Sequence, residues 1–509
     1  MEMSPYRPVT ATPRFRKATK VLKKKLQTRW QAIRKKCRLL FRRTSRLSTI
    51  KIHHQQLQNN SKNGCQPHRT LGHLLLPRTA SSFIDQGDKM TPTFSLKEDI
   101  SSMWQQIHGS TNWDTLLDPL HPWVRQEILK YGEFVQATYD AFDFDPLSEY
   151  CGSCRYNKMK LFDELGLTRH GYEVKRYIYA MSHVDVPEWL AKSYDSWSKD
   201  SNWMGYVAVS NNEESKRIGR RDIVVAWRGT VAPTEWYNDL RTKLELVDDN
   251  GDEDDQNDIK VQQGFLSIYK SKGEFTRYNK SSASEQVMQE VKKLVKIYTE
   301  NGEEVSLTIT GHSLGGALAL LNAYEAATSI PGLFISVISF GAPRVGNLSF
   351  RKKLNELRIN TLRVVIKQDI VPKVPGIILN NILNKVSRMT SRLNWVYRHV
   401  GTKLKLDIST SPYLRKDADV SGCHNLEVYL HLVDGYLGKK MNFRWNARRD
   451  LALVNKGSNM LVEKLRIPEC WYEMPHKGLV LNKYGRWVKP SRQPEDVPSP
   501  STSQLSSHN

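Results

Sequence analysis

Acidic residues are missing from the first part of the chain. No Asp or Glu occurs between Met3 and Ile84, whereas residues 1–84 carry 20 of the 76 Lys and Arg. Almost all of the net charge of +23 therefore belongs to this tail. An acid-poor segment rich in Arg, Lys, Ser and Thr is typical of organellar transit peptides, which are removed after import. We expect residues 1–85 to be a transit peptide or, alternatively, a disordered basic arm.

Within this tail, apolar residues recur at steps of three and four. They are Leu22, Leu26, Trp30, Ile33, Cys37 and Leu40. The spacing predicts a basic amphipathic helix, which suits an import receptor or an anionic membrane surface. Nucleic-acid binding is not expected, because no folded module with interleaved aromatic residues accompanies the charge. Composition alone leaves plastid and mitochondrion open.

Long apolar runs and dense cysteines are also lacking. No window approaches the roughly 18 consecutive apolar residues of a membrane-spanning helix, which indicates a soluble or peripheral protein. Six scattered cysteines are too few for a disulfide scaffold, so a reducing compartment is the default. Cys151 and Cys154 form a C-x-x-C pair without a thioredoxin-like context, which favours packing roles over a regulatory disulfide. No ligand cluster of suitable spacing predicts a metal or a cofactor.

The remaining chain predicts an α/β fold. Ordered sequence is expected over residues 91–490, with a helical part at 91–210 and a disordered tail at 491–509. Four β-branched runs predict buried strands at 223–227, 305–310, 334–340 and 362–366. Helices are predicted between them at 284–298 and 314–328. This alternation predicts a mostly parallel central sheet with crossover helices.

A nucleophile motif joins one of these strands to the next helix. Gly311-His312-Ser313-Leu314-Gly315 has the form G-x-S-x-G, and its glycines allow a tight turn between closely packed elements. The turn is expected to expose the Ser313 hydroxyl above the sheet edge, beside a helix N-terminus. Ser313 is therefore the predicted nucleophile of an α/β-hydrolase.

A serine hydroxyl is a weak nucleophile and needs a base oriented by a carboxylate. In this fold they follow in the order Ser, Asp, His. Asp369 comes at the C-terminal end of the strand predicted at 362–366, and His424 precedes an apolar helix at 427–435. His431 lies two helical turns on and is expected to pack or cap, and His312 lies inside the elbow. We expect Asp369 and His424 to complete the triad.

The oxyanion of the tetrahedral intermediate needs backbone N–H donors. One normally belongs to the residue after the nucleophile, here Leu314. The other comes from a loop after an early strand, and Arg228-Gly229-Thr230 fits this description. Thr230 is therefore the second expected donor.

Together these motifs resemble the class 3 lipases. The shared features are Trp227-Arg228-Gly229-Thr230, Glu235-Trp236 with Asp239, the serine motif, the segment from Phe340 to Asn347, Asp369-x-Val-Pro and a late His. A closer resemblance is to the plant phospholipase A1 group of plastid acylhydrolases, the anther-dehiscence type. The segments that carry it are 131–133, 139–143, 150–156 and 478–490. One departure is Ile366, because relatives often have Asn three residues before the aspartate.

The resemblance implies an interfacial acylhydrolase. It implies sn-1 deacylation of phosphatidylcholine or galactolipids, sometimes of triacylglycerol, at a membrane or lipid-droplet surface, with fatty acids supplied to oxylipin signalling. It also favours a chloroplast transit peptide for the basic tail. A soluble carboxylesterase and an inactive lipid-binding scaffold stay open as alternatives.

Two segments near the predicted triad are candidates for lipid contact. A lid is placed loosely at 231–247. Between Asp369 and His424, apolar residues again recur at steps of three or four: Leu379, Ile382, Val386, Met389, Leu393 and Val396. Basic residues occupy the other faces, so the segment predicts either a membrane-contacting helix or a helix packed on the core.

Overall fold

The computed structural model describes most of the chain after residue 97. The described residues are 98–144, 151–181, 201–230, 244–247, 258–274, 276, 278–375, 396–417, 420–444, 448–472, 480–481 and 484–488. The chain divides into two units, residues 1–92 and 93–509, and all described residues belong to the second. Several expected segments lie outside the described residues. They are both tails, residues 231–243 of the lid and residues 379–395 of the helical segment expected between Asp369 and His424.

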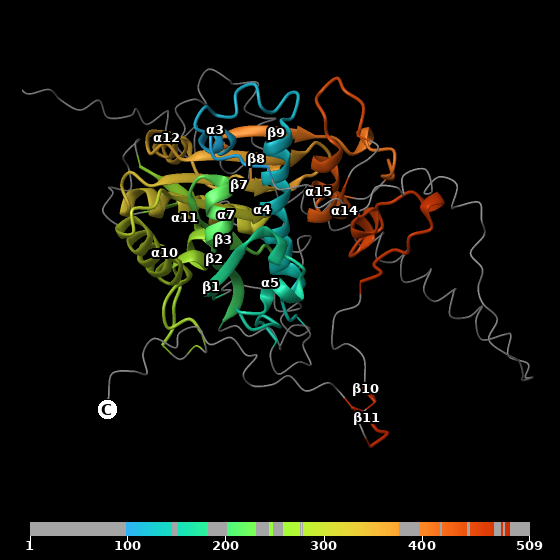
Figure 1. Cartoon of the computed structure of the whole chain (residues 1–509), viewed down its shortest axis with the longest axis horizontal. Coiled ribbons are helices and arrows are strands. Elements are labelled where there is room, and N and C mark those ends of the chain that lie inside the picture. The colour runs from blue at the N-terminus through green and yellow to red at the C-terminus, as the bar shows by residue number, and fades with distance from the viewer. Residues whose placement is uncertain are drawn as a thin grey trace, which may run out of the picture. The chain divides into compact units, whose positions relative to one another are not determined.

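A seven-stranded sheet forms the centre of the second unit (Figure 1). Its spatial order is β1 (Tyr172–Ala180), β2 (Asn202–Ser210), β3 (Arg221–Trp227), β6 (Val305–His312), β7 (Phe334–Phe340), β8 (Asn360–Ile366) and β9 (Thr402–Leu406). The five strands β3, β6, β7, β8 and β9 pair in parallel, whereas β2 pairs antiparallel with both β1 and β3. The predicted mostly parallel sheet is confirmed.

Strands β1 and β2 lie in the part of the chain that the sequence predicts as mostly helical. The structure differs there, because aromatic and β-branched residues such as Tyr177, Ile178 and Val207 suit a pleated, buried surface better than a helix. The helical expectation holds for α4 (Pro122–Asp140), whose N-terminal cap is the side chain of His121.

Helices cover both faces of the sheet. Along β3, Val224 and Ala226 face one hydrophobic core, and Ile223, Val225 and Trp227 face the other. The first core is closed by α3 (Trp104–Ile107), α4 and α15 (Leu426–Gly435), and the second by α9 (Gln263–Lys270), α10 (Ala283–Glu300), α11 (Leu314–Ser329) and α12 (Leu348–Glu356). Such a sheet, covered on both sides, is the α/β-hydrolase architecture expected from the sequence.

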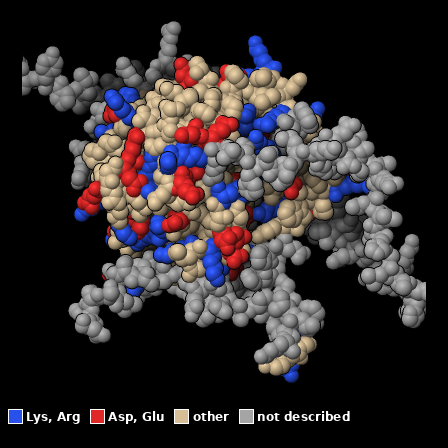
Figure 2. Space-filling view, in the orientation of Figure 1, with Lys and Arg blue, Asp and Glu red and all other residues tan. Residues whose placement is uncertain are grey.

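Shorter elements complete the described fold. They are α5 (Leu161–Glu164), α7 (Asn212–Ile218), β4 (Leu244–Leu246), β5 (Lys260–Gln262), α14 (Val420–Cys423), β10 (Val480–Leu481), β11 (Trp487–Val488) and the 3₁₀ turns Thr168–His170, Val371–Lys373, Ile408–Thr410, Leu451–Asn455 and Glu463–Leu465. None of the described helices is long and apolar enough to cross a membrane. Figure 2 shows basic and acidic side chains interspersed over the visible face, as the near neutrality of this part of the sequence predicts.

The C-terminal ends of the parallel strands share one edge of the sheet. Trp227 pairs in register with Gly311, and His312 pairs with Phe340. The loops that follow β3, β6, β7 and β8 therefore meet at this edge. They carry Thr230, Ser313 and Asp369, so the fold gathers residues that are far apart in the sequence.

Candidate active site

Ser313 occupies the turn between β6 and α11. Its φ of 58° lies in the left-handed region, which is unusual for a residue other than glycine. Its N–H donates to the carbonyl of Phe340 at 2.9 Å, which ties the turn to the end of β7. A strained residue between a strand and a helix is the backbone geometry of a nucleophile elbow.

The elbow requires glycine where the chain crosses the end of β3. A Cβ added to Gly315 would lie 2.3 Å from the carbonyl oxygen of Trp227, closer than any side chain can pack. The first turn of α11 therefore presses directly on the strand end that leads to Thr230. This contact brings the residue after the nucleophile, Leu314, toward the expected oxyanion loop.

The hydroxyl of Ser313 is buried, contrary to the expectation of an exposed group. The residue is 0% exposed, and its Oγ has no hydrogen-bond partner among the described residues. A buried hydroxyl without a partner is costly for stability and is uncommon away from functional sites.

Asp369 and His424 form a buried pair. Nδ1 of His424 donates to Oδ2 of Asp369 at 2.7 Å, and the two side chains are 2% and 0% exposed. The N–H of Val371 donates to Oδ1 of the same carboxylate at 2.8 Å. With the proton on Nδ1, the lone pair of His424 lies on Nε2, the state that a general base requires.

The ring of His424 lies over the elbow. Its centroid is 4.5 Å from that of His312, the residue before Ser313. The pKa of His312 is held well below its usual range by burial and by the neighbouring His424, so His312 is neutral at physiological pH. His431 makes a different contact, at 2.8 Å to the hydroxyl of Ser411, and its pKa is lowered to about 4 by burial and by Arg449.

The expected oxyanion loop follows β3 directly. Gly229 lies against Ser313, because a Cβ built on it would be 3.1 Å from Cβ of Ser313. Thr230 comes next in the chain, and its own hydroxyl is buried with no hydrogen-bond partner in the described part of the chain. The loop and the first residues of α11 therefore flank Ser313, as an oxyanion hole formed by two backbone N–H groups would require.

Two tyrosines contact the site residues and are not predicted by the sequence motifs. Tyr429 on α15 donates its hydroxyl to Oδ2 of Asp369 at 2.5 Å. Tyr139 near the end of α4 contacts Nδ1 of His312 at 2.8 Å and accepts the N–H of Gly229 at 3.2 Å. In the sequence both resemble core aromatics of apolar helices. Only their positions, five residues after His424 and within the segment 139–143, associate them with the motifs.

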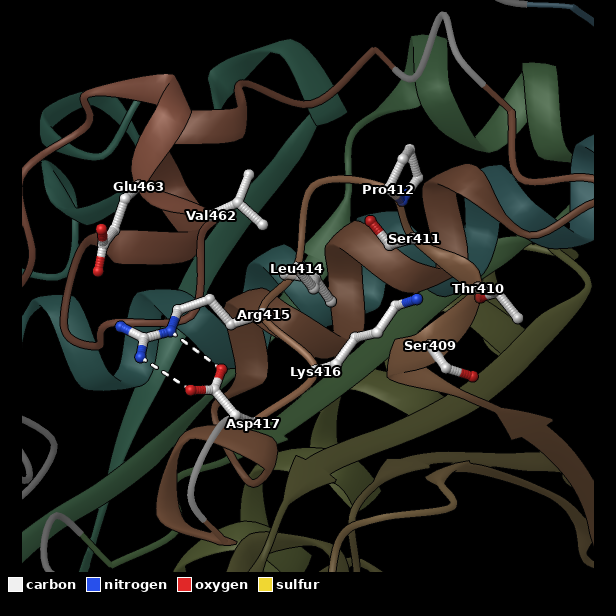
Figure 3. Close-up of a pocket in the computed structure, with 10 residues that line it drawn as sticks. All are labelled: Ser409, Thr410, Ser411, Pro412, Leu414, Arg415, Lys416, Asp417, Val462 and Glu463. Atoms are coloured by element: carbon white, nitrogen blue, oxygen red, sulfur yellow. Dashed lines mark hydrogen bonds and ion pairs between the residues drawn. The ribbon is translucent and has the colours of Figure 1, made fainter.

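A hollow of about 650 Å³ opens beside the 3₁₀ turn Ile408–Thr410 and the residues that follow it (Figure 3). It is lined by Ser409, Thr410, Ser411, Pro412, Leu414, Arg415, Lys416, Asp417, Val462 and Glu463. Ser313, Asp369 and His424 are not among these residues. Seven of these ten residues carry hydroxyl or charged side chains, and Arg415 pairs with Asp417 at 3.2 Å.

Comparison with known proteins identifies the family. The model of the class 3 lipases matches residues 224–379. Phospholipase A1-Igamma1, chloroplastic, of Arabidopsis thaliana is 46% identical over 416 residues, which cover 79% of this chain and 81% of the relative. The chain belongs to the phospholipase A1 group of the class 3 lipases. It is therefore an acylhydrolase, that is, a carboxylic ester hydrolase.

A second sequence relative agrees with this family. Phospholipase A1-Igamma2, chloroplastic, of the same plant is 46% identical, with 76% of each chain covered. Among solved structures, a lipase from Rhizopus microsporus var. chinensis is 20% identical, with a TM-score of 0.37 and coverage of 58% of this chain and 78% of that one. Membership of the phospholipase A1 group rests on the sequence relatives.

Proposed function

We propose that this acylhydrolase is a serine enzyme with Ser313 as nucleophile, His424 as general base and Asp369 as the carboxylate that orients it. The observation that carries the proposal is the buried hydrogen bond between His424 and Asp369 beside the strained Ser313. Leu314 and Thr230 are assigned as the backbone donors of the oxyanion hole. No step requires a metal or a cofactor.

The reaction follows from these positions. Nε2 of His424 takes the proton of the Ser313 hydroxyl while Oγ attacks the ester carbonyl carbon. The carbonyl oxygen becomes an anion that accepts hydrogen bonds from the two backbone N–H groups. His424 then protonates the departing alkoxide of the lysolipid, and the acyl group remains on Ser313. A water deprotonated by His424 hydrolyses this ester and releases the fatty acid.

The proposed substrates are membrane glycerolipids. The names of the relatives support a phospholipid cut at the first acyl position, and we extend the proposal to galactolipids and, less centrally, triacylglycerol. The proposed place of action is the chloroplast, because the relatives are named chloroplastic and the tail has the composition of a transit peptide. The relatives give no support to a mitochondrial location.

The decisive experiment uses phosphatidylcholine and galactolipids with different acyl chains at the two positions. Recombinant protein without the basic tail is incubated with vesicles of each lipid, and the released fatty acid is identified by mass. The proposal predicts release from the first position, saturation with rising vesicle concentration, and loss of roughly 10⁶-fold in turnover for Ser313→Ala. Equal release from both positions contradicts the positional assignment.

The same assay separates the two alternatives. A soluble carboxylesterase hydrolyses dispersed short esters without a rate increase when substrate forms micelles or vesicles. An inactive scaffold binds vesicles and hydrolyses neither substrate, and it is not labelled by a fluorophosphonate that reacts with activated serines. Labelling of wild type but not of Ser313→Ala supports the proposed nucleophile.

A further inference from the structure

Gly229, the residue that precedes Thr230, is held from both sides by side chains, of which Arg228 is buried and Tyr139 is partly buried. On one side, the N–H of Gly229 donates to the hydroxyl of Tyr139 at 3.2 Å. On the other, Nη1 of Arg228 donates to the carbonyl oxygen of Gly229 at 3.0 Å. Both polar groups of this residue are therefore fixed, although it lies in a loop where backbone groups usually face water.

Tyr139 links the two loops that flank the nucleophile. Its hydroxyl lies 2.8 Å from Nδ1 of His312 in the elbow and 3.2 Å from the N–H of Gly229. Because burial keeps His312 neutral and raises the pKa of Tyr139, the tyrosine donates its proton to Nδ1 and accepts from Gly229 with a lone pair. The hydroxyl therefore donates one hydrogen bond to the elbow and accepts one from the loop after β3.

The loop is tightly packed around Gly229. A Cβ on Gly229 would lie 2.3 Å from the Tyr139 hydroxyl, 2.6 Å from the carbonyl oxygen of His312 and 3.1 Å from Cβ of Ser313. The backbone of the loop is thus packed on the elbow itself. A small rotation of the Gly229 peptide would change the direction of the next N–H, that of Thr230.

Arg228 is a buried charge without a carboxylate within 4 Å in the part of the chain that the structure describes. It is 2% exposed, its guanidinium lies 3.7 Å above the ring of Phe142, and its Nε donates to the carbonyl of Trp203 at 2.9 Å. Burial lowers its pKa to about 10, so it stays charged at neutral pH.

A buried cation is expensive, and the described partners of Arg228 include the backbone carbonyls of Gly229 and Trp203. This one holds the carbonyl oxygen of Gly229, in the loop that carries the proposed donor Thr230. A fixed positive charge in a dry environment stabilises a developing negative charge more than it does in water. Arg228 therefore places a fixed positive charge on the loop that would carry the oxyanion donor.

We propose that Tyr139 and Arg228 are positioning residues of the oxyanion hole, which fix the Gly229 peptide and so aim the Thr230 N–H at the oxyanion. This inference rests on the proposed function, because it takes Ser313 as the nucleophile and Thr230 as a donor. It goes beyond it by assigning roles to two side chains outside the triad.

The test compares catalysis with the binding of a transition-state analogue. A long-chain alkyl trifluoromethyl ketone forms a hemiketal with an active serine and places an oxyanion in the hole, whereas the corresponding fatty acid does not. For Tyr139→Phe we expect kcat on a soluble ester to fall roughly 10- to 100-fold, less than the loss of a whole donor. The inhibition constant of the ketone should rise by the same factor, while KM and fatty-acid binding change less than about twofold.

Arg228→Lys is the second variant. It retains the charge but loses the forked geometry that holds the carbonyls of Gly229 and Trp203. We expect the same joint change in kcat and ketone affinity. Having two variants keeps the inference testable if one of them does not fold, which melting curves will show.

Tyr206→Phe is the matched control. Tyr206 is fully buried in the first hydrophobic core, whereas Tyr139 is partly buried, and the Tyr206 hydroxyl donates to the carbonyl of Phe134 at 2.8 Å. It should lose about 1 kcal/mol of stability, as Tyr139→Phe does, while its kcat and ketone affinity stay at the wild-type values.

The outcomes separate this inference from the proposed function. Wild-type kcat and ketone affinity in both folded variants overturn the positioning role, and so does a fall in kcat without a matching loss of ketone affinity. If Ser313→Ala remains active or the ketone fails to inhibit wild type, the proposed function itself is wrong. Joint loss in the two variants with an inactive Ser313→Ala supports both.

Discussion

Tyr429 and His424 donate to the same oxygen of Asp369. The tyrosine hydroxyl lies 2.5 Å and the imidazole Nδ1 2.7 Å from Oδ2. The tyrosine hydroxyl also accepts the N–H of Ile366 at 3.4 Å, the position where relatives often have Asn. Tyr429 thus connects the carboxylate to the end of β8 without a polar side chain at residue 366.

Replacing Tyr429 by Phe should alter the pH dependence of the reaction. The tyrosine hydrogen bond disperses the negative charge of Asp369, so its loss leaves a carboxylate that attracts the imidazolium of His424 more strongly. The acid limb of kcat/KM should therefore move to higher pH. We expect kcat/KM at neutral pH to fall by about 10-fold or less, measured on a soluble ester between pH 5 and 9.

Tyr269→Phe is the control for this prediction. Tyr269 is also buried and donates to a carboxylate, that of Glu325, at 2.6 Å, but on the opposite face of the sheet. Its removal should lower stability without moving the pH profile. An unchanged acid limb in Tyr429→Phe would show that the tyrosine only packs.

Asp369→Asn should be nearly as damaging as loss of the base. The amide offers an N–H where the imidazole needs an acceptor, so His424 turns to the wrong tautomer. Turnover of a soluble ester should fall about 10⁴-fold for Asp369→Asn, and no less for His424→Ala. His431→Ala should keep most of the activity, and the reverse ranking of the two histidines would refute the choice of base.

The sequence predicts the elements around Ser313 well because their signals are local. The β-branched run of β6, the glycines of the elbow and the small residues of α11 stand next to one another in the chain. The structure also brings Asp369 and His424 together from positions 55 residues apart, as their order in the sequence suggests.

Contacts made by residues without a motif could not be predicted. Tyr139 and Tyr429 reach the site only because α4 and α15 pack on the same face of the sheet, and packing of this kind leaves no pattern in the sequence. In the sequence, Arg228 resembles an ordinary turn residue. Only the structure shows that it is buried, with no carboxylate near it among the described residues. The sequence does not predict strands β1 and β2, because aromatic residues without clean alternation are compatible with both helices and strands.

Stability should fall as the pH drops below neutrality. Burial lowers the pKa of both His108 and His431 from 6.5 to about 4, so the native state binds fewer protons than the unfolded state between these values. Unfolding free energy therefore rises with pH across this window, by on the order of 3 kcal/mol for each histidine. Urea unfolding at pH 7 and 4.5 measures the difference, and His431→Gln should reduce it. The same pH dependence in wild type and variant would mean that His431 keeps its ordinary pKa.

The mature plastid protein should lack the basic tail. The acid-free composition ends at Asp85 and patterned sequence follows, so we expect the mature N-terminus between about 60 and 90. N-terminal sequencing of protein isolated from chloroplasts locates it. Recovery of an intact Met1 form from the cytosol would contradict the transit interpretation.

The segment between β8 and His424 is one of the two candidates for lipid contact. Its helical pattern at 379–396 lies largely outside the described residues, but the structure fixes both places where it joins the fold. Before it, the turn Val371–Lys373 directly follows Asp369, and after it the N–H of Arg398 donates to the carbonyl of Gly346 at 2.9 Å. The segment therefore leaves the fold at the edge of the sheet that carries the site and rejoins it beside Gly346, in the loop after β7.

A double replacement of Met389 and Leu393 by Ser distinguishes membrane contact from core packing. If the apolar stripe enters a lipid surface, the variant loses vesicle binding and lipid hydrolysis, because apolar burial at the interface drives adsorption. Turnover of a soluble ester and the melting temperature then stay near wild type, since no buried contact is removed. If the stripe packs on the core, two large-to-small changes destabilise the fold by several kcal/mol, roughly 2–5 for each, and the melting temperature falls steeply. Vesicle flotation and melting curves on the same preparation therefore give opposite results for the two arrangements.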